Sequence, residues 1–272
     1  MEACDRAIME RTEERALLAR LDDLMRLSER GEVSCTAFLT PAEAVRGRRY
    51  AVSCGYGQRV IADGGYTDAE RVRLFFLPEY YEGLTEEDDR PEVVIEAIRE
   101  AVVAVRINGS GYRVLGHRDF MGSILGLGID RDALGDIAVL NDYEAVVFCG
   151  EPVAKLLEES LEKVASDTVK VSRVAKGQSV SVVRRFETVS DTVASPRLDC
   201  VVAALANLSR ERAQTTVRNG LCEVDYETVE DCDLQLVPPC VVSIRGCGKY
   251  RLVSLSDLTK KGRVRLVAEK YI

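Results

Sequence analysis

The spacing of apolar residues predicts helices at the start of the chain. Between residues 17 and 25, apolar positions recur at helical spacing: Leu17, Leu18, Leu21, Leu24 and Met25. Gly31 ends this pattern. Thr40 and Pro41 then mark the start of a second helix, because Thr caps a helix and Pro fits its first turn. Two short runs at 59–66 and 73–78 predict strands around a Gly-Gly turn.

An acidic, Pro-containing segment at 82–92 follows these strands. This composition indicates a domain boundary in the same part of the chain, between residues 80 and 90. The apolar residues of 92–117 fit either a pair of strands or a helix with a strand, and they include a strong Asn-Gly-Ser-Gly turn.

The next elements alternate between helix and strand. A short helix is expected at 118–128, with Asp119 able to cap it. Two apolar runs joined by the Asn-Asp pair at 141–142 predict a hairpin. A helix that begins near Pro152 and a strand at 168–174 follow. The order strand, helix, hairpin, helix, strand predicts an α/β sandwich with one sheet.

The C-terminal part begins after a short polar linker at 175–179. It contains two predicted helices. Ser195 and Pro196 are suited to the N-cap and the first position of one helix. Ser209 is suited to cap the other, and Gly220 to end it in the left-handed conformation.

Three further apolar runs, at 221–225, 240–246 and 249–255, predict a small twisted sheet. The chain is therefore expected to have an α+β fold. It is expected to contain three small domains: an N-terminal α/β domain at 1–80, a middle sandwich at 81–178 and a C-terminal domain at 181–272.

The charge distribution favours the C-terminal domain as an anion-binding part. The formal net charge is −8, but residues 181–272 contain 14 Lys and Arg against 12 Asp and Glu. Residues 81–180 contain 11 against 19. Phosphate-bearing partners are therefore expected to bind near the C-terminus.

The cysteines and the N-terminus indicate a cytoplasmic protein. The nine cysteines are odd in number and form no C-x-x-C motif, and His117 is the only histidine. We expect reduced structural thiols, no zinc site, no other metal and no cofactor. The sequence has neither an apolar run long enough for a membrane span nor the apolar segment of a signal peptide.

Helical phase groups the basic residues of segment 209–219. At about 100° per residue, Arg210, Gln214 and Arg218 fall within an arc of about 80°. Arg212 falls on the far side. Arg197 joins the first group if the two helices pack side by side. Long basic side chains at helix starts reach backbone phosphates, so this face is a candidate RNA contact.

Neighbouring positions complete the predicted surface. Ala213 and Val217 lie beside the basic face and are expected to be buried. Arg245, Lys249 and Arg251 surround a Gly-rich turn and extend the candidate contact.

The C-terminal residues resemble the alpha-L RNA-binding domain, here called the S-four domain. The matching positions are Ser195, Arg197, Leu198, Asp199, Val202, Ala203, Ser209, Arg210, Ala213, Gly220 and Val224. The resemblance implies a grip on structured RNA through the two helices and the following strand loop. The implied RNA-binding residues are Arg197, Ser209, Arg210, Gln214, Arg218, Arg245, Lys249 and Arg251. Asp225 replaces an Asn frequent in the family, and Pro239-Cys240 replaces a Gly-Asp pair.

A second motif resembles the middle-domain signature of the YlmH family. The matching positions are His117, Arg118, Asp119, Gly122, Leu127, Gly128, Ile129, Arg131, Gly135, Asp136 and Ile137. The resemblance implies an N-terminal domain, a middle domain similar to an RNA-recognition motif and a C-terminal S-four domain.

Two interpretations of the His-Arg-Asp motif remain open. His117 and Asp119 suit general acid–base chemistry, but no nucleophile stands near them, so a structural turn at a helix start is favoured. The neighbouring Leu-Gly-Leu-Gly lacks the third glycine of a dinucleotide loop. Arg118 and Arg131 either contact RNA or belong to a domain that holds the others in place, because aromatic stacking strands are missing.

The resemblance implies a non-enzymatic bacterial RNA-binding protein. Its implied partners are ribosomal RNA, the large ribosomal subunit and tRNA in the form of peptidyl-tRNA, and its implied role is rescue or quality control of stalled translation. No membrane partner is expected. The alternatives are an RNA-modifying enzyme with catalytic residues in the first 180 positions, and an adaptor for cell-division proteins that uses the acidic middle domain.

Overall fold

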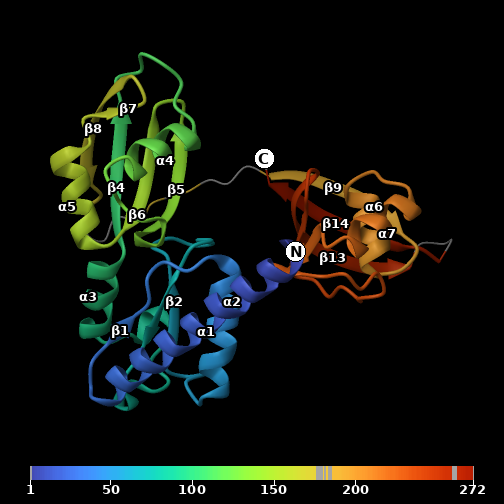
Figure 1. Cartoon of the computed structure of the whole chain (residues 1–272), viewed down its shortest axis with the longest axis horizontal. Helices are drawn as coiled ribbons and strands as arrows, with labels where there is room; N and C mark the ends of the chain where they lie inside the picture. Colours follow the sequence, from blue (N-terminus) through green and yellow to red (C-terminus); the bar gives the residue numbers. More distant parts are fainter. Residues whose placement is uncertain (1, 176–179, 181, 183–185, 259–261, 272) are drawn as a thin grey trace. The chain divides into compact units, whose positions relative to one another are not determined.

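The computed structural model describes residues 2–175, 180, 182, 186–258 and 262–271 (Figure 1). Contacts divide the chain into two compact units, residues 1–182 and 183–272. The fold is α+β, as predicted. The further division at residue 80 stays a prediction, and most of the predicted linker, 176–179, lies outside the described residues.

The first unit begins with two helices against a small sheet. Its elements are α1 (Glu2–Glu29), α2 (Pro41–Ser53), β1 (Ser34–Cys35), β2 (Val60–Asp63) and β3 (Arg73–Phe76). The strands pair antiparallel in the order β1-β3-β2. Thr40 caps α2 in a reciprocal box with Glu43, with the Thr40 N–H donating to Oε2 at 2.7 Å. Leu21 and Phe76 are fully buried between helices and sheet.

The rest of this unit is a second, larger sheet, and two of its helices pack on one face. Its helical elements are η1 (Glu79–Tyr81), η2 (Glu87–Asp89), α3 (Glu92–Ala101), α4 (His117–Leu125), η3 (Arg131–Ala133) and α5 (Glu151–Ser160). Its strands are β4 (Val103–Gly109), β5 (Leu134–Asn141), β6 (Glu144–Cys149), β7 (Lys163–Val164) and β8 (Asp167–Arg173).

In the sheet the strands lie in the order β5-β6-β4-β8-β7. Along the chain, β4, α4, the β5–β6 hairpin, α5 and β8 follow one another as predicted, with the short strand β7 added before β8. This βαββαβ order is that of ferredoxin-like folds. The ambiguous stretch after the acidic loop is a helix, α3, followed by a strand, β4. Phe120 of α4 and Leu157 of α5 pack on Val105 and Val147 of the sheet.

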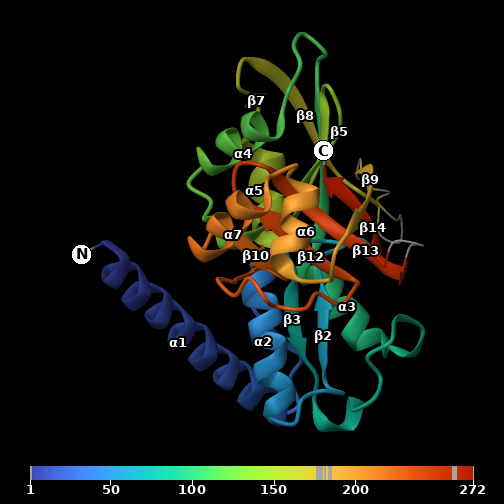
Figure 2. The same ribbon diagram turned by 90° about the vertical axis from the view of Figure 1, so that its right-hand side faces the viewer.

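The second unit is a six-stranded antiparallel sheet with two helices on one face (Figure 2). Its elements are β9 (Phe186–Val193), α6 (Leu198–Leu205), α7 (Arg210–Arg218), β10 (Cys222–Val224), β11 (Glu227–Thr228), β12 (Cys240–Ile244), β13 (Gly248–Leu258) and β14 (Val264–Tyr271). The strand order is β11-β10-β12-β13-β14-β9. Ala213 and Val217 are fully buried against the sheet, as predicted. Gly220 has φ +64°, which confirms the predicted helix end.

The predicted N-caps of two helices are wrong. Helix α6 begins at Leu198, not at Pro196, because the backbone of Arg197 is extended and pairs with Gln235. The N–H of Leu198 donates to a carbonyl of the same segment, Leu234, at 2.9 Å, so no side chain caps this helix. In α4 the N-cap is Gly116, and Asp119 instead accepts the Gly116 N–H at 2.8 Å from inside the first turn.

Candidate nucleic-acid interface

A buried carboxylate joins the two helices of the second unit. Asp199, in the first turn of α6, is fully buried. It accepts hydrogen bonds from Arg197 at 3.0 and 3.1 Å and from Gln214 at 2.9 Å. The Nε atom of Arg210 lies 3.8 Å from the same carboxylate. The structure thus brings together three of the predicted residues around Asp199.

The electrostatics of this cluster explain how a carboxylate is kept inside. Burial alone would raise the pKa of Asp199, but the hydrogen bonds from Arg197 and Gln214 outweigh it and lower the pKa to about 2. Arg197 also pairs with the exposed carboxylate of Asp233. Two carboxylates therefore offset the positive charge of Arg197.

The exposed surface of α7 carries the other predicted residues. Ser209 caps the helix, and its Oγ accepts the N–H of Arg212 at 3.3 Å. The side chain of Arg210 is 65% exposed, and Arg218 is exposed in the last turn. Arg212 is exposed too, but helical phase directs it to a different side of α7. The solvent-exposed positive charge of this face therefore lies mainly on Arg210 and Arg218.

The remaining predicted residues lie elsewhere on this unit. Arg245 is exposed in the turn between β12 and β13. Lys249 and Arg251 belong to β13, where they alternate with the buried Tyr250 and Leu252. Because successive strand residues point to opposite faces, these two cations lie on the face of the sheet that α6 and α7 do not cover.

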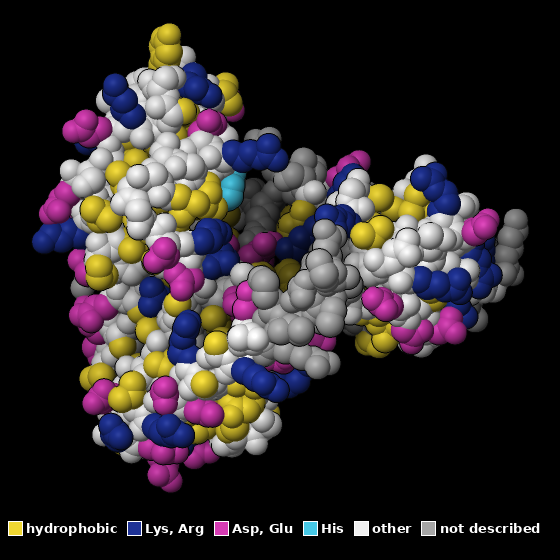
Figure 3. Space-filling model, in the orientation of Figure 1, with side chains coloured by type: hydrophobic (Ala, Val, Ile, Leu, Met, Phe, Trp, Pro, Cys, Tyr) yellow, Lys and Arg dark blue, Asp and Glu magenta, His cyan; other side chains and the backbone are white. Residues whose placement is uncertain are grey.

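The His-Arg-Asp motif lies at the start of α4 on the surface of the first unit. Asp119 stabilises the turn and forms an ion pair with Arg113 at 3.6 Å. Arg118 is exposed. Figure 3 shows His117, the only histidine, in cyan beside Lys or Arg side chains. Partial burial and the nearby charge of Arg131 lower the pKa of His117, so the ring is neutral at neutral pH.

Two signature residues join the two sheets of the first unit. Asp136 accepts hydrogen bonds from the Tyr66 hydroxyl at 2.7 Å and from the backbone N–H groups of Glu70 and Arg71 at 2.7 and 3.2 Å. At the neighbouring Gly135, an added Cβ would lie 2.7 Å from the Phe38 ring. This role was not predicted from the sequence, although the adjacent Gly-Asp pair belongs to the signature.

Arg71 and Arg131 support the same junction. The Arg71 guanidinium donates to the carbonyl oxygens of Leu134 at 2.9 Å and Phe38 at 2.8 Å. Arg131 donates to those of Leu134 and Gly135 at 3.0 and 3.1 Å. Arg131 is therefore engaged in holding the junction, whereas Arg118 remains at the surface.

The middle sheet does not offer an open stacking face at its centre. Phe148 of β6 is fully buried, and Tyr66 stacks on it with ring centroids 4.8 Å apart and an interplanar angle of 26°. Val146 on the same face packs with Ile61 and Phe75 of the N-terminal part. RNA bases cannot stack on this part of the sheet without displacing those contacts.

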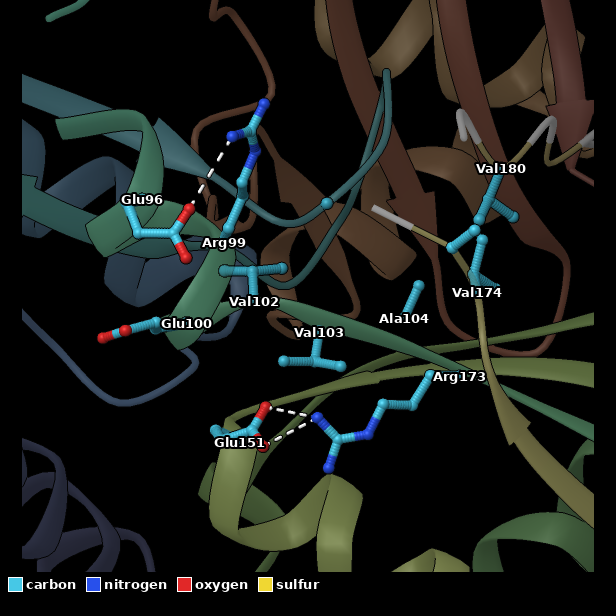
Figure 4. A pocket seen from close by; sticks show the side chains of 12 residues that line it. Glu96, Arg99, Glu100, Val102, Val103, Ala104, Glu151, Arg173, Val174 and Val180 are labelled. Atoms are coloured by element: carbon cyan, nitrogen blue, oxygen red, sulfur yellow. Dashed lines mark hydrogen bonds and ion pairs between the residues drawn. The ribbon is translucent and has the colours of Figure 1, made fainter. Parts of the chain in front are cut away.

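A hollow of about 590 Å³ lies among α3, β4, α5 and β8 (Figure 4). Four of its charged lining residues form two ion pairs, Arg99 with Glu96 at 3.7 Å and Arg173 with Glu151 at 2.7 Å, and Glu100 lines the hollow beside them. The two pairs are structural contacts between neighbouring elements. Within the described ranges, no group of His, Cys, Asp or Glu side chains is arranged to hold a metal ion. Among the same residues, none of the helices has the length and apolar composition of a membrane span.

Residues 102–178 match a family model described as "Putative RNA-binding domain in YlmH". This segment is therefore similar to the RNA-binding domain of the YlmH family. The predicted YlmH resemblance is thereby confirmed, whereas the S-four assignment stays a prediction.

Two relatives extend the comparison. The chain is 29% identical over 264 residues to the ribosome-associated protein quality control protein P2 of Bacillus subtilis (strain 168), with 96% of each protein covered. A solved structure, the cell division protein ylmH from Streptococcus pneumoniae, aligns with a TM-score of 0.49 and 20% identity, covering 62% of this chain and 95% of that one. The family description concerns RNA binding, and the name of the Bacillus relative concerns the ribosome; neither names a catalytic activity.

Proposed function

We propose that this chain is a cytosolic, non-enzymatic RNA-binding protein that acts in rescue or quality control of stalled translation. Its target is structured RNA of the large ribosomal subunit that retains peptidyl-tRNA. The observation that carries this proposal is the similarity to a ribosome-associated quality control protein across 96% of both chains. The similarity of residues 102–178 to the RNA-binding domain of the YlmH family supports the RNA-binding part.

The S-four-like helices supply the proposed main contact. Arg210 and Arg218 are exposed, and Arg210 lies 3.8 Å from the buried Asp199 carboxylate. We assign them direct contacts with backbone phosphates. Arg197 is held by Asp199 and Asp233, so its proposed role is to position the start of α6.

The proposed role of the first unit is mainly to build a rigid platform. Gly135 and Asp136 join its two sheets, and Phe148 lies beneath Tyr66. Arg118 remains an exposed candidate for a secondary RNA contact.

Sedimentation of ribosomal particles tests the proposal. On sucrose gradients, we expect the full chain to migrate with free large subunits more than with small subunits or polysomes. Treatments that split stalled ribosomes and leave peptidyl-tRNA on the large subunit should increase this fraction. Deletion of residues 181–272 should move the protein to the top of the gradient.

Charge-reversal variants of α7 refine this experiment, and among them the single variants Arg210→Glu and Arg212→Glu change the charge equally. The double variant Arg210→Glu/Arg218→Glu should reduce the large-subunit fraction at least tenfold, on the order of two lost charge-assisted contacts. The control Arg212→Glu should change it less than twofold, because this side chain lies on another side of α7. Equal losses for Arg210→Glu and Arg212→Glu would contradict the assigned face. Continued large-subunit binding by the variant that lacks residues 181–272 would place the main contact in the first unit.

A further inference from the structure

Rings and cations gather on the helix-free face of the C-terminal sheet. Side chains alternate along β13, and Tyr250 and Leu252 are buried beneath α6 and α7. Lys249 and Arg251 therefore point to the opposite face of the sheet. The rings come from three other places in the sequence: the β10–β11 turn, the start of β9 and the end of β14. They belong to Tyr226, Phe186 and Tyr271.

The five side chains form a continuous group. The Lys249 Nζ atom lies 4.7 Å from the ring centroid of Tyr226 and 4.8 Å from that of Tyr271. The Arg251 guanidinium lies 4.8 Å from the Phe186 centroid. The rings of Phe186 and Tyr271 meet edge to face, with centroids 5.0 Å apart. We call these five residues the ring–cation group.

The group is fixed in place yet reachable from solvent. Glu269 accepts a hydrogen bond from the Arg251 Nε atom at 2.9 Å, which holds the guanidinium plane. All five side chains are partly exposed, and none belongs to the buried core of this unit.

The backbone at Tyr226 gives an independent indication of function. Asp225 and Tyr226 form the two-residue turn between β10 and β11, with φ values of +47° and +69°. Such turns favour glycine at the second position, because other residues adopt this left-handed conformation at an energetic cost. The chain places a tyrosine there instead, and its ring joins the group. Strain of this kind concentrates at functional sites.

We propose that the ring–cation group binds a single-stranded RNA segment by base stacking. Aromatic rings stack on bases of any sequence, and interleaved cations meet the phosphates between them. Arg265 adds an exposed positive charge to the same face, since β14 alternates from Glu269 through Val267 to Arg265. This contact goes beyond the proposed function, because it lies across the sheet from the phosphate-binding helices and takes unpaired bases.

The test compares two fluorescein-labelled RNAs by anisotropy with the full chain. One is a ten-nucleotide oligouridylate, and the other is a hairpin closed by a short loop. Tyr226→Gly should weaken oligouridylate binding about tenfold, as expected for the loss of one stacked base, and change hairpin binding less than twofold. Glycine suits this turn, so the variant should unfold at the same or a higher temperature than the natural protein.

Controls separate this proposal from the function proposed above. Tyr112→Ala removes a tyrosine that is 82% exposed in the first unit, and should leave both affinities unchanged. Arg210→Glu/Arg218→Glu should weaken hairpin binding and largely spare the oligouridylate. Unchanged hairpin affinity in that double variant would contradict the proposed RNA contact of α7, and it would leave the stacking proposal untouched. An oligouridylate affinity unchanged by Tyr226→Gly, or no measurable oligouridylate binding by the natural protein, would overturn the stacking proposal.

Discussion

Replacement of Asp199 by Asn should destabilise the C-terminal unit by a predictable amount. The carboxyl has an ordinary pKa of 3.8, and its pKa in the folded protein is about 2. At about 1.4 kcal/mol per pH unit, this difference stabilises the fold by about 2 kcal/mol at neutral pH. Asn cannot carry the charge that Arg197 and Gln214 stabilise, so the variant should lose most of this free energy.

The effect should depend on pH in a defined direction. The folded-state pKa of Asp199 is depressed, so its contribution is fully present above its ordinary pKa and is lost as the pH falls from about 4 to 2. The free-energy difference between the natural protein and Asp199→Asn should therefore fall from about 2 kcal/mol at pH 7 to about 1 kcal/mol at pH 3.

Hydrogen exchange measured on peptides from α6 and α7 gives the local free energy of opening at both pH values. The matched control is Asp233→Asn, which removes the other carboxylate beside Arg197. Asp233 is 69% exposed, so the control should cost less than about 0.5 kcal/mol at pH 7. The reasoning fails if the two variants cost the same, or if the effect of Asp199→Asn is equally large at pH 3.

Two further predictions concern salt dependence and the junction of the two sheets. The first is measured as the slope of log affinity for a structured RNA against log salt concentration. Arg210→Ala/Arg218→Ala should make this slope shallower by about 1.5 to 2, whereas Arg212→Ala should leave it unchanged. An unchanged slope for the double variant would show that these two side chains do not contact phosphates. The second concerns Asp136→Ala, which should raise the rate of amide hydrogen exchange at Glu70 and Arg71, because their N–H groups lose their acceptor. The control Asp130→Ala in the same unit should leave these rates unchanged. Equal exchange rates in the two variants would show that the Asp136 carboxylate does not hold this segment.

Capping residues in the sequence predicted the helix starts that depend on hydrogen bonds between near neighbours in the chain. Thr40 and Ser209 cap α2 and α7 through atoms three residues away. The predicted start of α6 failed because the segment at Leu234 and Gln235 takes the backbone partners of Arg197 and Leu198. That segment is distant in sequence, so capping rules could not include it.

The outer strands of the C-terminal sheet show a second limit. Strands β9 and β14 pair along their whole length, but the apolar alternation of Val264, Leu266 and Ala268 is short and was not recognised. Without these strands, Lys249 and Arg251 could be placed in a turn region but not on a face of the sheet. Helical phase succeeded for Ala213 because it depends only on the helix itself.

The exposed residues of the candidate site could be predicted from the sequence, whereas the buried carboxylates that support it could not. The exposed basic residues of α7 could be found from charge and periodicity. Asp199 and Asp136 act from inside the structure, and their partners lie up to 15 and 70 positions away. A carboxylate among apolar neighbours is a sequence signal for such a role, but its partners become known only from the fold.

The contact between Tyr66 and Phe148 limits how this chain can be divided. Phe148 and Val146 are fully buried, and part of their cover comes from Phe75 and Ile61 of the N-terminal part. A fragment limited to 102–178 would present these apolar side chains to water, and such patches promote aggregation. The family-defining segment is therefore not a self-sufficient module in this protein. Residues 1–182 form one compact unit, and a break near residue 80 would separate two halves of a shared core.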